Sequence, residues 1–128
     1  MNRNFSIRDA VFFELSGEAL DVAGLLSVGF RPGISASVEM AWQIAGSNRQ
    51  LQILFGQVED FIIRGRDEEY PGQSGSSLSI AGFSNGNPNP NEPELFLEAT
   101  PENNYMTFVM GDRSVLAVKA AKADMRQL

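Results

Sequence analysis

Apolar and polar side chains alternate along most of this chain with the two-residue period of β-strands. The alternation is clearest in residues 37–45, and it resumes in residues 51–55 after Gly, Ser and Asn at 46–48 predict a turn. Residues 37–56 therefore predict an antiparallel hairpin with one buried face. The apolar positions of this hairpin are Val38, Met40, Trp42, Ile44, Leu51, Ile53 and Phe55.

The rest of the chain carries the same signal in shorter pieces. Gly56 and Gln57 predict a bend or bulge, after which residues 60–64 form a further strand. Residues 18–30 fit a strand or a short helix, and Gly24 and Gly29 within them and Gly17 just before them favour the strand, because a glycine costs about 1 kcal/mol inside a helix. Both faces of residues 115–118 are apolar, which predicts a central strand. The other expected strands are residues 5–15 (one bent strand or a pair), 78–83, 95–99, 105–110 and 114–119.

These segments predict an all-β fold of about eight or nine short strands, either an antiparallel β-sandwich or a partly open barrel. Residues 111–113 predict a tight hairpin connection between the last two strands. The tail from residue 120 to 128 has a helix-forming composition, so at most one short helix is expected. A chain of 128 residues fits one domain, residues 1–128.

Histidine and cysteine are absent from the chain. Their absence excludes Ser-His-Asp and Cys-His hydrolases, zinc–sulfur sites and disulfides. Carboxylates remain, and a pair such as Glu39 and Glu98 would suit glycoside hydrolysis. Both occupy the polar phase of predicted strands, however, which is typical of solvent-facing side chains. We therefore expect no enzyme, no cofactor and no metal site.

The chain carries a formal net charge of −6, and the excess is local. Residues 59–102 contain nine acidic residues and two arginines. This field repels phosphate, so no nucleic-acid partner is expected, whereas a basic protein would be attracted. No apolar run approaches the about 20 residues of a membrane helix. The first residues do not resemble a secretion signal, and a cytoplasmic protein with no membrane contact is expected.

Two long loops interrupt the strands, at residues 66–77 and 84–93. Loops of this length in a compact domain are usually functional. The first contains Asp67, Glu68, Glu69 and Tyr70, which predict a partner-binding surface because an exposed tyrosine among carboxylates is typical of protein interfaces. The resulting hypothesis is a non-enzymatic binding domain whose acidic surface contacts a basic protein.

The same loops leave other functions open. Asp67–Glu69 could ligate calcium, and alternating asparagines of the second loop could offer amide oxygens to a cation or a sugar. A solvated acidic loop and a stiff, proline-rich connection explain the same residues. The alternatives are thus a carbohydrate- or calcium-dependent recognition module, or a structural subunit of a homo-oligomer. The asparagines are Asn85, Asn87, Asn89 and Asn91.

Four aromatic residues could form a platform for stacking a sugar ring. Trp42 shares its phase with the apolar positions of the hairpin, which favours core packing over ligand stacking. Tyr70 lies beside Pro71-Gly72 in the acidic loop and is the better exposed candidate. The other two residues are Phe83 and Tyr105.

Residues 51–65, LQILFGQVEDFIIRG, and 78–84, LSIAGFS, form a pattern of strand alternation interrupted by glycines. Over residues 51–84 the chain resembles small bacterial all-β proteins that are mostly uncharacterised, some of which are immunity-type proteins that neutralise a toxin. The resemblance implies a non-catalytic bacterial domain, and it carries no functional residue to a position of this chain.

Overall fold

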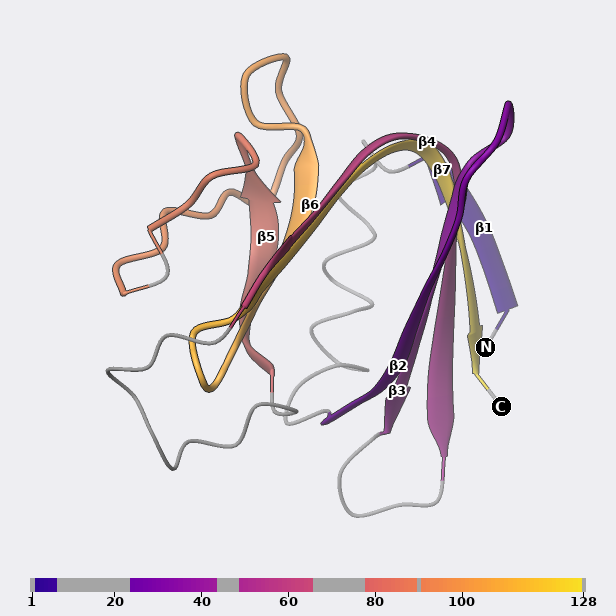
Figure 1. Ribbon diagram of the computed structural model, residues 1–128, viewed down its shortest axis with the longest axis horizontal. Helices are drawn as coiled ribbons and strands as arrows, with labels where there is room; N and C mark the ends of the chain where they lie inside the picture. Colours follow the sequence, from indigo (N-terminus) through magenta and orange to yellow (C-terminus); the bar gives the residue numbers. More distant parts are fainter. Residues whose placement is uncertain (1, 7–23, 44–48, 66–77, 90, 128) are drawn as a thin grey trace.

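The structure is a computed structural model that describes residues 2–6, 24–43, 49–65, 78–89 and 91–127. These residues form seven β-strands and no helix (Figure 1). The strands are β1 (Asn2–Ser6), β2 (Gly24–Arg31), β3 (Ser37–Gln43), β4 (Gln50–Arg64), β5 (Leu78–Ser84), β6 (Tyr105–Met110) and β7 (Val115–Gln127).

All seven strands belong to one antiparallel sheet with the order β2-β3-β4-β7-β6-β5, and β1 pairs with the C-terminal part of β7. The sheet curls into a half-barrel (Figure 1). The all-β prediction is confirmed. The described residues contain no second sheet, so the sandwich is not found among them. They form seven strands and not the eight or nine expected, because two long strands run through the curl and belong to both of its sides.

The first of these long strands is β4, which bends where glycine and glutamine predicted a bend. Gln57 has a φ of 53°, and the pairing with β7 shifts between Val58 and Asp60. A bulge of this kind increases the local twist and bends the strand. Residues 60–64 are in a strand, as predicted, but they belong to β4 and are not a separate strand, because the ladder to β7 continues past the bulge as far as Arg64.

The second long strand is β7, which takes in the tail expected to have helical composition. Residues 122–126 pair with β1 on one side and with β4 on the other. Ala123 and Met125 are buried in the core. The composition of the tail left its structure open, and the tail is a strand because so short a helix gains little by itself, whereas two neighbouring strands offer hydrogen bonds and burial.

The bends divide the sheet into two halves that share β4 and β7. We call them the β2 half, which contains β2 and β3, and the β5 half, which contains β5 and β6. Their inner faces meet in one core, where the rings of Trp42 and Phe108 lie 5.3 Å apart. Outside this core, the half-exposed ring of Phe30 lies 5.9 Å from the ring of Phe61. The described apolar positions of the predicted hairpin are all buried in this core, as expected: Val38, Met40, Trp42, Leu51, Ile53 and Phe55.

Several shorter predictions are confirmed. Residues 24–31 form a strand and not a helix, and residues 105–110 form β6. Residues 115–118 are buried and lie between β4 and β6, as predicted for a central strand. The connection at residues 111–113 turns back on itself, with Arg113 at a φ of 71°.

One predicted strand is wrong. Residues 95–99 form no strand, and Phe96 alone makes an isolated bridge to Phe83 of β5. Prolines at 93 and 101 flank this stretch, and a proline cannot donate a ladder hydrogen bond. Of the predicted strand or strand pair at residues 5–15, only residues 5 and 6 are described, in β1. Residues 7–15, residues 18–23 of the segment expected to be a strand and the turn at 46–48 lie outside the described residues.

Within the described part of the chain there is no helix with the length and apolar character needed to span a membrane.

Candidate functional site

The residues predicted to bind a partner, Asp67, Glu68, Glu69 and Tyr70, lie outside the described residues. That assignment stays a prediction. They belong to the acidic segment at residues 59–102, of which the structure describes residues 59–65, 78–89 and 91–102.

The candidate carboxylate pair is not brought together. Glu39 lies on β3 in the β2 half, where its Oε1 accepts a hydrogen bond of 2.5 Å from Nε2 of Gln52. Glu98 lies in the connection between β5 and β6, not on the strand expected for it. Both side chains are exposed, which confirms that they face solvent. They do not face each other across a pocket of the kind that a glycoside hydrolase needs.

The three described residues of the aromatic platform do not form it, and the fourth, Tyr70, lies outside the described residues. Trp42 and Phe83 are fully buried, so core packing of the tryptophan is confirmed. Tyr105 is half-buried, and its hydroxyl donates a hydrogen bond of 2.5 Å to Oδ2 of Asp60. This hydrogen bond, together with burial and the negative charges of Asp60 and Glu59, raises the pKa of Tyr105 to about 12. The hydroxyl therefore stays protonated at any ordinary pH.

The asparagine-rich loop uses its amide oxygens on its own chain. Oδ1 of Asn85 accepts from the backbone N of Asn87 at 2.9 Å, and Oδ1 of Asn89 accepts from the backbone N of Asn91 at 3.0 Å. Arg64 of β4 donates to Oδ1 of Asn87. These are turns that stiffen the connection, and no cluster of three potential metal ligands occurs in the described ranges.

The same loop lies over the outer face of the β5 half, and we call residues 85–89 and 91–102 the covering loop. Arg64 also donates a hydrogen bond to the carbonyl oxygen of Pro88 in this loop, and Pro88 is a buried residue. Over Gly82 the contact is so close that an added Cβ would lie 2.6 Å from Cβ of Leu95. Phe96 and Phe83 exchange two backbone hydrogen bonds of 2.7 and 3.0 Å, which occupy the outer edge of β5 at that point.

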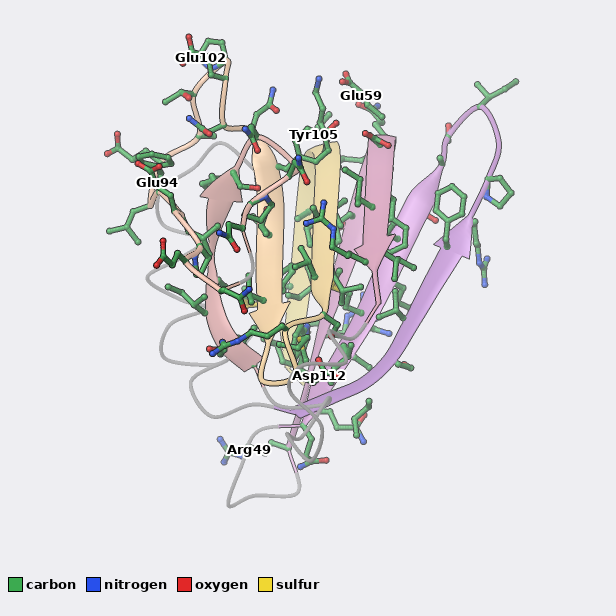
Figure 2. All side chains as sticks on the ribbon, turned by 60° about the vertical axis from the view of Figure 1, so that its left-hand side comes forward. Arg49, Glu59, Glu94, Glu102, Tyr105 and Asp112 are labelled. Atoms are coloured by element: carbon green, nitrogen blue, oxygen red, sulfur yellow. The ribbon has the colours of Figure 1, made fainter. Side chains whose placement is uncertain are left out.

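The outward side of the covering loop is acidic and partly apolar. Its four glutamates are exposed, and so are Phe96 (41%) and Leu97 (71%). No lysine or arginine occurs from residue 85 to residue 112. Glu94 and Glu102 project from the loop toward the end of the molecule at which Glu59 and Tyr105 lie (Figure 2). We call this the acidic surface: Glu92, Glu94, Phe96, Leu97, Glu98 and Glu102.

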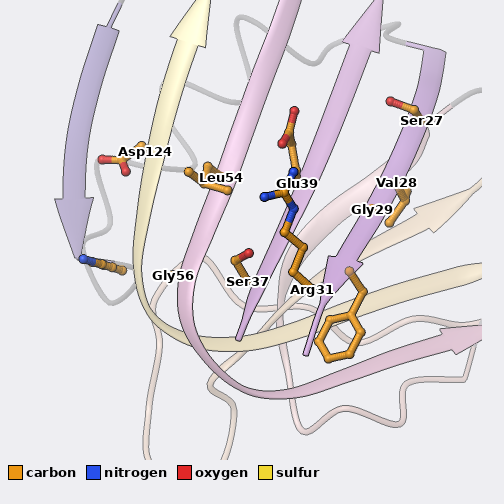
Figure 3. A pocket seen from close by; sticks show the side chains of 11 residues that line it. Ser27, Val28, Gly29, Arg31, Ser37, Glu39, Leu54, Gly56 and Asp124 are labelled. Atoms are coloured by element: carbon orange, nitrogen blue, oxygen red, sulfur yellow. The ribbon is translucent and has the colours of Figure 1, made fainter. Parts of the chain in front are cut away.

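A second surface lies on the outer face of the β2 half, where a groove of about 610 Å³ crosses β2, β3, β4 and β7 (Figure 3). The sequence analysis did not find this groove, because its charged side chains come from segments far apart in the chain. Each of these side chains also occupies a position where the strand pattern expects a polar residue. Only Gly56 gave a signal, as a predicted bend. The groove is lined by Ser27, Val28, Gly29, Phe30, Arg31, Ser37, Glu39, Leu54, Gly56, Lys122 and Asp124.

Comparisons of this chain with protein families, with curated proteins and with solved structures give no match. The resemblance of residues 51–84 to small bacterial β-proteins therefore stays a prediction.

Proposed function

We propose that this protein is a non-enzymatic binding domain that contacts a basic protein partner through the acidic surface. The observation that carries the proposal is the exposure of Phe96 and Leu97 within a frame of four exposed glutamates. Apolar side chains that a partner covers supply the affinity of an interface, and a rim of one charge selects the partner and steers its approach.

The acidic surface has a rigid support, which favours binding without a large ordering cost. Phe96 is held to β5 by two backbone hydrogen bonds, and Thr100 and Asn103 close a turn through bonds of 3.1 and 3.2 Å between their backbones. Glu94 and Glu98 flank Phe96 and Leu97 within this fixed stretch. A partner would therefore meet a preformed arrangement of two apolar side chains and several carboxylates.

The experiment compares capture of partner proteins by the wild type and by two surface variants. The Glu94→Lys/Glu98→Lys variant reverses the charge next to the apolar side chains, and Phe96→Ala/Leu97→Ala removes them. We expect each variant to lose most of the captured partner, with an unchanged melting temperature because all four side chains are exposed. High salt should slow association of the wild type, since the charges act mainly on the on-rate.

The control reverses one exposed charge outside both the acidic surface and the groove, Arg126→Glu at the C-terminal end of β7, and should leave capture unchanged. Reversal of Asp67, Glu68 and Glu69 to lysine tests whether the acidic segment before β5 belongs to the same interface. Equal capture by the wild type and by both acidic-surface variants would refute the proposal.

A further inference from the structure

The outer groove of the β2 half carries both signs of charge in separate rows. In one row, Glu39 pairs with Leu54 and Leu54 pairs with Asp124 across neighbouring strands. Two positions further along the strands, Arg31 lies opposite Ser37, and Lys122 lies opposite Gly56. Residues two apart on a strand share a face and are separated by about 7 Å. The groove thus has an acidic row and a basic row on one surface.

In the described part of the chain, these charges do not neutralise one another. Among the described residues, no ion pair joins Glu39 or Asp124 to Arg31 or Lys122, and the hydrogen bond that Glu39 accepts comes from the neutral amide of Gln52. Leu54 lies between the two acids and is 40% exposed, so the floor of the acidic row is apolar. Figure 3 shows the side chains of Arg31 and Glu39 projecting from neighbouring strands over the groove.

The groove opens at the edge of the sheet, over Gly29. This glycine lies opposite Glu39, and a Cβ added to it would have no atom within 4 Å. A side chain that approaches from beyond β2 can therefore pass over Gly29 and reach the carboxylate of Glu39. The aliphatic part of a lysine or arginine would lie on the open glycine backbone while its charged end meets the acid.

The edge itself is suited to adding a strand. β2 is the terminal strand of the sheet path, and no described strand pairs with its second edge. Leu26 and Phe30 on this strand are 51% and 49% exposed, although large apolar side chains at an edge normally gain by being covered. Strand addition supplies main-chain hydrogen bonds for affinity and places alternate side chains on the two faces for specificity.

We infer that β2 binds an extended, antiparallel peptide segment of a partner protein, with an acidic side chain opposite Arg31 and a basic side chain opposite Gly29. The antiparallel direction matches every other pair in the sheet. In this direction the acidic residue precedes the basic one by two positions. The recognised chemistry is therefore an acidic–apolar–basic triplet in an extended chain, with its apolar residue turned toward the side of Phe30. This site is distinct from the acidic surface and does not depend on it.

The test uses end-blocked, fluorescently labelled nine-residue peptides and measures fluorescence anisotropy. The probe has Glu-Val-Lys at its centre, flanked by threonine and valine. We expect it to bind, and we expect a peptide with Glu-Val-Glu to bind at least about fivefold more weakly, because like charges would meet at Glu39. Two further peptides carry N-methyl groups on alternate backbone nitrogens, one on the odd and one on the even positions. Only one of these two sets of N–H groups points at β2, so one methylated peptide should lose binding and the other should keep it.

A charge exchange tests the contact directly. Glu39→Lys should weaken the Glu-Val-Lys peptide at least about fivefold and strengthen the Glu-Val-Glu peptide. Gly29→Val, whose Cβ would meet no atom within 4 Å, places a branched side chain in the opening and should abolish the preference between the two peptides. Glu98→Lys is the matched control; it makes the same charge change on the acidic surface and should leave both affinities unchanged.

The inference is wrong if no peptide binds at millimolar concentration, or if Glu39→Lys and Gly29→Val leave the peptide preference intact. Analytical ultracentrifugation of the free protein adds a further outcome. A dimer that the peptide does not dissociate, and that Phe30→Ala disrupts, would assign the β2 edge to a second copy of this chain and overturn the peptide as its occupant. Loss of partner capture by the Glu94→Lys/Glu98→Lys variant has no bearing on these results, so the two proposals fail independently.

Discussion

The two halves of the curled sheet are built on the same two long strands, yet their outer faces differ. On the β5 half, Thr107, Val109 and Ala117 are completely buried, because the covering loop closes the outer face and is held there through Gly82 and Arg64. On the β2 half the same face is open and carries a charged groove. One half is thus packed on both sides, and the other presents a surface.

The difference shows which side chains can serve binding with little loss of folding stability. Side chains of the β5 half contribute to a core on both faces, so a change there alters packing. Side chains on the outer face of the β2 half contribute little to packing and are free to serve recognition. The covering loop combines both roles, since its inward side packs on the sheet and its outward side forms the acidic surface.

The largest expected effect comes from breaking the contact that joins the halves. Trp42→Ala should lower the free energy of unfolding by about 3–5 kcal/mol, because a fully buried ring is lost and a cavity opens beside Phe108. Urea denaturation measures the change, and Phe108→Leu serves as a milder variant if the alanine protein does not fold. Phe30→Ala, which removes a half-exposed ring, should cost clearly less. Equal losses for Trp42→Ala and Phe30→Ala would show that the halves are not joined through the buried pair.

An effect of intermediate size on stability should distinguish the closed outer face of the β5 half from the open outer face of the β2 half. Gly82→Ala should lower the free energy of unfolding by about 1–3 kcal/mol, because the new Cβ would displace Leu95 and the backbone of Phe96. Gly29→Ala is the matched change on the open face, where a Cβ meets nothing, and should stay within about 0.5 kcal/mol of the wild type. Thermal denaturation compares the two. A neutral Gly82→Ala variant would mean that the covering loop does not seal the β5 half.

The smallest expected effect is a pH dependence at the bend. The hydrogen bond from Tyr105 to Asp60 favours the protonated phenol in the folded state, so the folded pKa of about 12 exceeds the ordinary value of 10.0. This hydrogen bond contributes about 1 kcal/mol to the free energy of unfolding. The contribution is fully present below pH 10 and is lost as the pH rises from 10 to 12.

The measurement is the difference in free energy of unfolding between the wild type and Tyr105→Phe at several pH values. We expect a constant difference between pH 7 and 9 and a decrease toward zero between pH 10 and 12. Asp60→Asn is the control, because without the carboxylate the same alkaline decrease should become smaller. A difference that grows above pH 10 would contradict the assignment.

Much of the fold could be predicted from local pattern. The buried positions of the β3–β4 hairpin, the bend at Gly56 and Gln57, and the central place of residues 115–118 all follow from side-chain period and turn residues. Local pattern decided less where long-range pairing matters. Composition left the structure of the alanine-rich tail open, and the tail joined the sheet because two strands were available to it. The predicted strand at residues 95–99 is wrong, because Leu95 and Phe96 lie over Gly82 instead.

The sites were less predictable than the fold. The exposed acidic character of residues 92–102 was visible as an excess of negative charge, but their position on a loop that covers β5 was not. The amide oxygens of Asn85, Asn87 and Asn89 suited a ligand by composition, and the structure uses them within the chain. The bonds of Asn85 and Asn89 are local turns of two residues, whereas the bond from Arg64 to Asn87 joins distant parts of the chain and leaves no trace in a local pattern.

The sequence by itself determined which side chains share a face of each strand, because successive side chains of a pleated strand point to opposite faces wherever the strand lies. It also determined the excess of acid and the absence of histidine and cysteine. Only the tertiary structure decided that Gly29, Glu39, Leu54 and Asp124 form one row of a groove. The physical reason is that pairing between strands brings together residues far apart in the chain, and no local preference specifies which strands become neighbours.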